Sequence, residues 1–217
     1  MPMAGLPPLD ALLAADSFVR PSALQLPQWQ ELERELAITF PADYRELALR
    51  YDLATAEAAF TRFAPPATGS GEDGLLVGLR LSYNPDDSPF ATFYRARQVI
   101  PVGVDYAERY FVLVVGQAQQ RQRTPYPYGS LWLFDPVDPS APNPTASVFQ
   151  PVSSSFAQAL HMAYYANSLY RGKTADSLAG DPHSSAWQTA LFNRLTTLDT
   201  AIRKQSYWRE WIAAMVS

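Results

Sequence analysis

The 217-residue sequence contains no cysteine and only two histidines, His161 and His183. The absence of cysteine excludes disulfides, thiolate-held zinc or iron–sulfur sites and a cysteine nucleophile. A metal site usually needs two or more neighbouring nitrogen, sulfur or carboxylate ligands, and neither histidine has such a set around it in the sequence. We therefore expect no metal and no other cofactor.

Long apolar runs and basic clusters are also missing. No stretch of about 18 uninterrupted apolar residues occurs, and the apolar N-terminal segment has no basic residues before it and is broken by Asp10 and Asp16. These features predict a soluble, cytoplasmic protein that does not enter a membrane. No run of lysine and arginine resembles a nucleic-acid footprint, so a nucleic-acid partner is not expected either.

Charge is scarce and unevenly distributed. Charged residues make up 18% of the chain; residues 1–110 hold 15 acidic and 9 basic side chains, and residues 111–217 hold 6 and 8. The first half is thus net negative and the second slightly positive. Solvated helix faces would explain this pattern, but if charge guides a partner to the protein, that partner is basic.

No group of residues has the spacing of a catalytic site. The segment GSGEDG, residues 69–74, fits a dinucleotide-binding pattern, but it follows a proline-rich loop instead of a strand and carries two acids that would repel phosphate. Asp181, His183 and Ser184 supply the residue types of a hydrolase triad, but triad members converge from separate elements. The paired carboxylates lie in loops or on the polar side of a helix, and we expect no enzymatic activity.

The N-terminal third is predicted to be helical. Residues 1–26 are interpreted as a loosely attached arm with one short helix near residues 9–15. Helices then start near Pro27 and Pro41, because proline lacks the N–H that the first turn leaves unpaired. In the second, FPADYRELALRY (residues 40–51), apolar positions recur at helical spacing. The helical pattern is predicted to continue through residues 54–63.

A sheet is predicted next, followed by more helices. Short runs of β-branched and aromatic residues predict strands at residues 75–82, 98–103, 110–116, 130–135 and 146–152. The short links between them favour antiparallel pairing. A helix with a serine N-cap is predicted in the segment SSSFAQALHMAYYANSLY, where apolar residues again recur at helical spacing. Two further helices are predicted after residue 185. The order predicts an α+β fold: a central, mostly antiparallel sheet packed with helices, plus a C-terminal helical extension.

Four ordered segments, "FPADYRELALRY", "YRARQVIPVGVDYAERYFVL", "GSLWLFDPVDP" and "VSSSFAQAL", together resemble the SUKH superfamily. The matching residues are Phe40, Pro41 and Tyr44; Ile100, Pro101 and Gly103; Phe111 and Leu113; Gly129, Leu131 and Asp135; and Ser155 and Phe156. The chain departs from the family in the turn VDYAERY (residues 104–110), which contains no glycine. The resemblance covers residues 27–170, so we assign residues 1–26 to an N-terminal arm, 27–170 to the SUKH-like domain and 171–217 to a helical extension packed on it.

The resemblance implies a function in protein binding. Bacterial members of this superfamily are mostly immunity proteins, which bind and neutralise a toxin used in competition between cells, such as a secretion-system effector. We therefore expect this chain to bind a cognate toxin and to occlude its active site. Fungal relatives suggest an alternative, a regulatory or scaffolding module that binds an endogenous partner. An immunity gene should adjoin the gene of a secreted toxin, which distinguishes the two.

Two segments are candidate partner-binding surfaces. Residues 125–136 place Tyr126 and Tyr128 just before a strand that carries Trp132 and ends at Asp135. Tyrosine and tryptophan are frequent interface anchors, so Trp132 is predicted either to meet a partner or to be covered by the aromatic C-terminal helices.

The second segment is the turn after residue 104, which contributes Asp105, Tyr106 and Glu108. Acidic side chains interleaved with an aromatic ring suit the capture of a basic toxin surface, although an ordinary solvated turn has the same composition.

Overall fold

The computed structural model describes residues 6–58, 61–66, 74–88, 90–117, 126–135, 149–172, 180–200 and 207–217. The helices are α1 (Leu9–Ala14), α2 (Leu26–Leu36), α3 (Ala42–Arg50), the short 3₁₀ helix η1 (Leu53–Thr55), α4 (Gly74–Tyr83), α5 (Ala91–Arg97), α6 (Phe156–Tyr170), α7 (Ser185–Leu198) and α8 (Tyr207–Val216). The strands are β1 (Ile38–Thr39), β2 (Glu57–Ala58), β3 (Thr61–Arg62), β4 (Val99–Val104), β5 (Tyr110–Val114), β6 (Gly116–Gln117), β7 (Leu131–Phe134) and β8 (Phe149–Ser153). The predicted α+β fold is confirmed.

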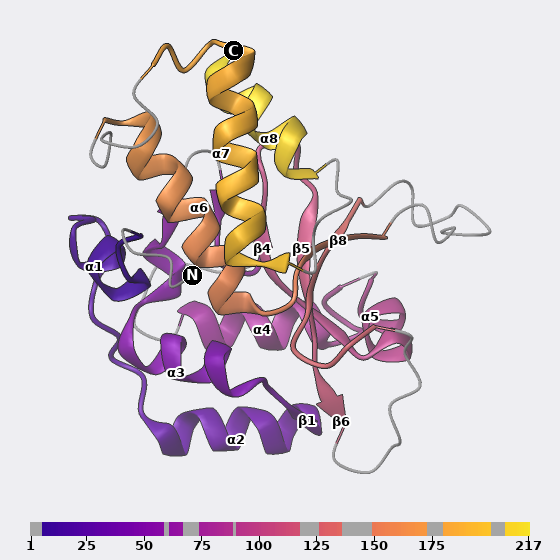
Figure 1. The fold of residues 1–217 in the computed structure, drawn as a ribbon. Coiled ribbons are helices and arrows are strands. Elements are labelled where there is room, and N and C mark those ends of the chain that lie inside the picture. Colours follow the sequence, from indigo (N-terminus) through magenta and orange to yellow (C-terminus); the bar gives the residue numbers. More distant parts are fainter. Residues whose placement is uncertain are drawn as a thin grey trace.

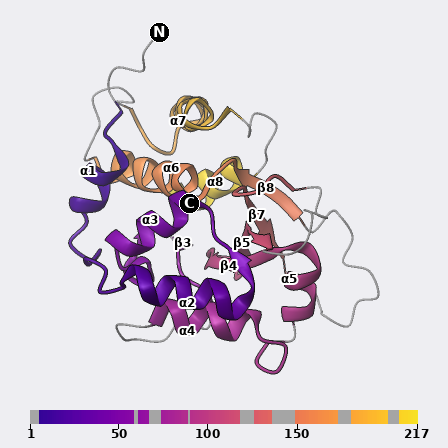
Figure 2. The same ribbon diagram turned by 90° about the horizontal axis from the view of Figure 1, so that it is seen from below.

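Within the described residues, six strands form one antiparallel sheet in the order β2-β3-β4-β5-β7-β8, and β1 pairs separately with β6. Helices α4 and α5 lie on one side of the sheet and α6 and α8 on the other, with α7 outside α6 and α8 (Figures 1 and 2). Side chains on a strand alternate between the two faces. Phe134 therefore meets Phe93 of α5, whereas Phe111 meets Tyr207 of α8 on the opposite face.

The predicted helix starts are confirmed where a local cap determines them. Pro41 directly precedes α3, and Ser155 caps α6 by accepting a hydrogen bond from the Gln158 N–H. Asp43 lies in the first turn of α3, and its carboxylate accepts the Ala157 N–H of α6 at 2.9 Å. The two helix starts are thereby tied together.

Two predicted elements are wrong. Residues 75–82, expected as a strand, belong to α4, where Leu75, Leu79 and Tyr83 are buried at helical spacing and Val77 faces solvent. Residues 54–63 were expected to continue a helix, but the described ones belong to η1 and to the paired strands β2 and β3, and Arg62 of β3 pairs with Val104 of β4. Helix α5 was not predicted at all.

The described part of the N-terminal arm is packed on the domain, in contrast to the loose attachment expected. Leu12 and Leu13 of α1 are buried, and His161 Nε2 of α6 lies 2.9 Å from the Pro7 carbonyl oxygen. The arm also bonds to α3, since Arg50 donates a hydrogen bond to the Asp10 carboxylate at 2.5 Å.

This contact predicts a lowered carboxyl pKa. Hydrogen bonds from Arg50 and Tyr51 to the Asp10 carboxylate hold the pKa of Asp10 below its usual 3.8. The stabilisation is therefore complete above about pH 4 and is lost as pH falls through the lowered pKa. In the Arg50→Gln variant we expect the pKa of Asp10 to rise towards 3.8, as measured by NMR titration of its carboxyl carbon. An unchanged pKa would contradict the contact.

Candidate binding surface

The seven predicted partner-binding residues lie towards opposite ends of the sheet. Tyr110 pairs with Phe134 and Leu113 with Leu131, so β5 and β7 run antiparallel in full register. The turn between β4 and β5 and the residue after β7, Asp135, are therefore at one end, while Tyr126 and Tyr128 precede β7 at the other. At about 3.3 Å per strand residue, the length of β7 separates the two groups by roughly 13 Å.

We call residues 105–109 the acidic turn. Asp105 in this turn does not face solvent: its side chain is fully buried. Its carboxylate accepts hydrogen bonds from the Ala107 N–H at 3.0 Å, the Arg109 N–H at 2.9 Å and Arg109 Nε at 2.9 Å. Asp105 thus fixes the shape of the turn and cannot contact a partner directly.

Arg109 connects the acidic turn to the C-terminal helix. Its guanidinium lies 6.0 Å from the ring centroid of Tyr106 and 5.7 Å from that of Tyr207 in α8. One nitrogen also lies 3.8 Å from the Glu210 carboxylate. The sequence interpretation missed Arg109, although an aspartate four residues before an arginine across a strand–strand turn is a readable signal.

Tyr106 and Glu108 remain accessible at the tip of the acidic turn. Tyr106 is 43% exposed. Glu108 is exposed and has a φ of 60°, a left-handed conformation that is costly for a residue with a side chain, and its N–H donates to the Asp105 carbonyl at 3.1 Å. The hydrogen bonds and the ion pair between Asp105 and Arg109 stabilise this conformation.

At the other end, Trp132 is half-buried beneath residues of its own chain. Its ring centroid lies 4.5 Å from that of Tyr126, which in turn stacks on Phe149 at 5.3 Å. Trp132 Nε1 donates to Ser130 Oγ at 2.8 Å. The predicted cover by the C-terminal helices is wrong, because α8 packs on the opposite face of the sheet through Tyr207.

Tyr128 is separate from this aromatic cluster. It is 46% exposed and lies beside Gly116, near the start of α3. Partial burial raises the pKa of Tyr128, the negative charge of Glu33 adds to this effect, and Arg45 opposes it. Its hydroxyl is therefore a neutral hydrogen-bonding group at pH 7.

The candidate catalytic residues have structural contacts. Asp181 Oδ1 accepts the His183 N–H, and Ser184 caps α7 by accepting the Trp187 N–H. Among paired acids, Glu33 accepts the Phe40 N–H and Glu35 pairs with Arg80. Positions 69–73 of the GSGEDG segment lie outside the described residues.

Comparisons of this chain with family models, curated proteins and solved structures find no match. In the described part of the chain, no three histidine, aspartate or glutamate side chains gather in a way that could hold a metal ion. No described helix has the length and apolar character needed to cross a membrane. The geometry of the two ends of the sheet is therefore the basis for any functional argument.

Proposed function

We propose that this protein is a non-catalytic immunity protein that binds a cognate bacterial toxin and occludes its active site. The observation that carries the proposal is the acidic turn. It presents the exposed Tyr106 and Glu108 on a backbone that the buried Asp105 and Arg109 hold in one conformation. A contact loop fixed in advance loses little conformational entropy on binding, which favours tight association.

Charge at this end of the sheet suits a basic toxin surface. Glu108 and Asp135 are exposed, and the Glu210 side chain is 50% exposed next to Arg109. Such charges mainly accelerate the encounter with an oppositely charged partner, while a central aromatic residue such as Tyr106 mainly slows dissociation. Occlusion of an active site requires only this complementarity and no covalent step.

The SUKH-like motif residues support the fold part of the proposal through their positions. Gly103 lies at a β-bulge, where an added Cβ would approach the Arg62 carbonyl oxygen to 2.9 Å. Gly129 has a φ of 83°, which favours glycine before β7. Phe156 and Tyr44 are buried together. These residues specify the platform, and the toxin-specific surface is carried by the turns between them.

The direct test is co-expression with the toxin encoded beside the gene. We expect growth rescue and a stable complex on size-exclusion chromatography. Tyr106→Ala should weaken binding about 30-fold, corresponding to an interface anchor of about 2 kcal/mol. Glu108→Lys should lower the association rate and its dependence on salt.

Tyr128→Ala is the matched control, because Tyr128 is similarly exposed but lies near the opposite end of β7. Equal losses for Tyr106→Ala and Tyr128→Ala would reject the acidic turn as the contact surface. Absence of both rescue and complex would reject the toxin as partner. A complex formed instead with a protein of the same cell would favour a regulatory or scaffolding module.

A further inference from the structure

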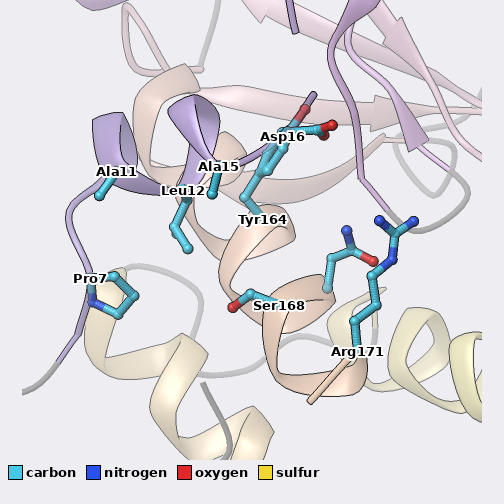
Figure 3. A pocket seen from close by; sticks show the side chains of 9 residues that line it. Pro7, Ala11, Leu12, Ala15, Asp16, Tyr164, Ser168 and Arg171 are labelled. Carbon is cyan, nitrogen blue, oxygen red and sulfur yellow. The ribbon is translucent and has the colours of Figure 1, made fainter. Parts of the chain in front are cut away.

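A pocket of about 180 Å³ lies between α1 and the C-terminal half of α6 (Figure 3). Its polar lining comes from Asp16, Tyr164, Asn167, Ser168 and Arg171. The pocket exists because the N-terminal arm packs on α6 through Leu12 and Leu13. It is separate from the acidic turn and plays no part in the proposed toxin contact.

Asn167 lines the pocket, and its side-chain amide has unused hydrogen-bonding capacity. Only 7% of the residue is exposed, and its side chain forms no hydrogen bond with any other described residue. Its backbone carbonyl is occupied by the Arg171 N–H of the helix end, which leaves the side-chain amide for the pocket. This amide is therefore available to a polar group of a ligand in the pocket.

Two opposite charges border the same pocket. Figure 3 shows the Asp16 carboxylate beside the Tyr164 ring, with the Arg171 side chain extending along the pocket from the end of α6. Neither Asp16 nor Arg171 forms an ion pair with another described residue. Burial, together with the charge of Asp16, raises the pKa of Tyr164, so this phenol stays neutral at pH 7.

The remaining wall is apolar and small. Ala11, Leu12 and Ala15 of α1 provide it. Sites for drug-sized ligands usually measure about 300–1,000 Å³, so a pocket of about 180 Å³ suits a molecule of only a few heavy atoms. The ligand should therefore combine a positive group, a negative group and a short apolar side chain.

We propose that this pocket binds a free α-amino acid. The carboxylate meets Arg171 and the Asn167 amide, the ammonium group meets the Asp16 carboxylate, and the side chain rests on the α1 wall. Each of the two charged groups could also come from the end of a peptide, because a peptide C-terminus offers only the carboxylate and an N-terminus only the ammonium. The test must separate these sources.

Isothermal titration of the purified full chain with each of the twenty L-amino acids provides that test. We expect saturable binding of at least one with an apolar side chain, and at least tenfold weaker binding of its N-acetyl and its amide derivatives. Binding of either blocked derivative as tightly as the free amino acid would overturn the zwitterion proposal in favour of a peptide end. Absence of binding by all twenty at millimolar concentration would overturn it as well.

Two variants locate the binding at the pocket. Asp16→Asn preserves an acceptor for the Phe18 N–H, and Arg171→Gln alters only an exposed side chain, so both should fold with an unchanged unfolding midpoint. Each should weaken binding at least tenfold. Arg209→Gln, in the separate pocket between α7 and α8, is the control and should leave the affinity unchanged. Unchanged affinity in both pocket variants would place the ligand elsewhere and reject the proposal.

Discussion

Replacing Phe156 by alanine is expected to lower the free energy of unfolding by about 3–5 kcal/mol, the usual cost of emptying a buried aromatic site. Phe156 is fully buried. Its ring centroid lies 4.6 Å from that of Tyr44 in α3 and 5.9 Å from that of Phe63, the residue after β3. The side chain therefore joins the first residue of α6 to two other parts of the core. Denaturant unfolding monitored by circular dichroism measures the change.

Phe18→Ala is the matched control for this prediction. Phe18 is 74% exposed, so its removal should change the free energy of unfolding by less than about 0.5 kcal/mol. A loss below about 1 kcal/mol for Phe156→Ala would mean that the ring does not fill the core as described. A change in the denaturant slope as well would indicate an altered unfolded or native state instead of a simple loss of packing.

The sequence predicted best those elements whose start is determined by a local cap. The serine before α6 and the prolines at the starts of α2 and α3 act within one helical turn, so neighbouring residues suffice to identify them. The strands β4, β5, β7 and β8 were also identified, because β-branched and aromatic residues cluster there between turn residues. Their antiparallel order followed from the short links.

The wrong elements depended on contacts that neighbouring residues do not report. The segment GLLVGLRLSY is apolar almost throughout, so its sequence alone does not distinguish a helix from a strand, and its contacts with α2 and β4 lie far away in the sequence. The alanines before Thr61 favour a helix, but pairing with β4 overrides that propensity. Helix α5 is capped at its C-terminus by Gln98, which has a left-handed φ of 55°. Glycine is the usual residue at such a position, so the sequence contains no recognisable signal for the end of this helix.

The acidic turn was predicted as a turn between two strands, which the pairing of β4 with β5 confirms, but the direction of its side chains was not predicted. Acidic and aromatic residues at 105–108 were expected to face a partner together, yet Asp105 turns inward because Arg109 and two backbone N–H groups converge on it. Glu108 likewise has a left-handed backbone conformation, and because it is not a glycine the sequence does not indicate this conformation. Side-chain direction in a short turn depends on these few hydrogen bonds, which composition alone does not specify.

Asp105→Ala is expected to destabilise the protein by about 3–5 kcal/mol, the cost of removing one partner of a buried ion pair. The Arg109 side chain is only 14% exposed and would lose the carboxylate 2.8 Å from one of its nitrogens. The two turn N–H groups would also lose their acceptor. Chemical denaturation gives the stability, and amide exchange of Ala107 and Arg109 reports whether the turn itself opens.

Asp105→Asn separates the two contributions, because its amide oxygen can still accept the backbone N–H groups while the charge opposite Arg109 is lost. We expect a smaller stability loss than for alanine, with the amides of the acidic turn still protected. If the turn must be held in one conformation to bind a toxin, Asp105→Ala should weaken binding more than Asp105→Asn, although the buried carboxylate touches no partner. Equal toxin affinity in wild type and Asp105→Ala would show that preorganisation of the acidic turn contributes nothing to binding.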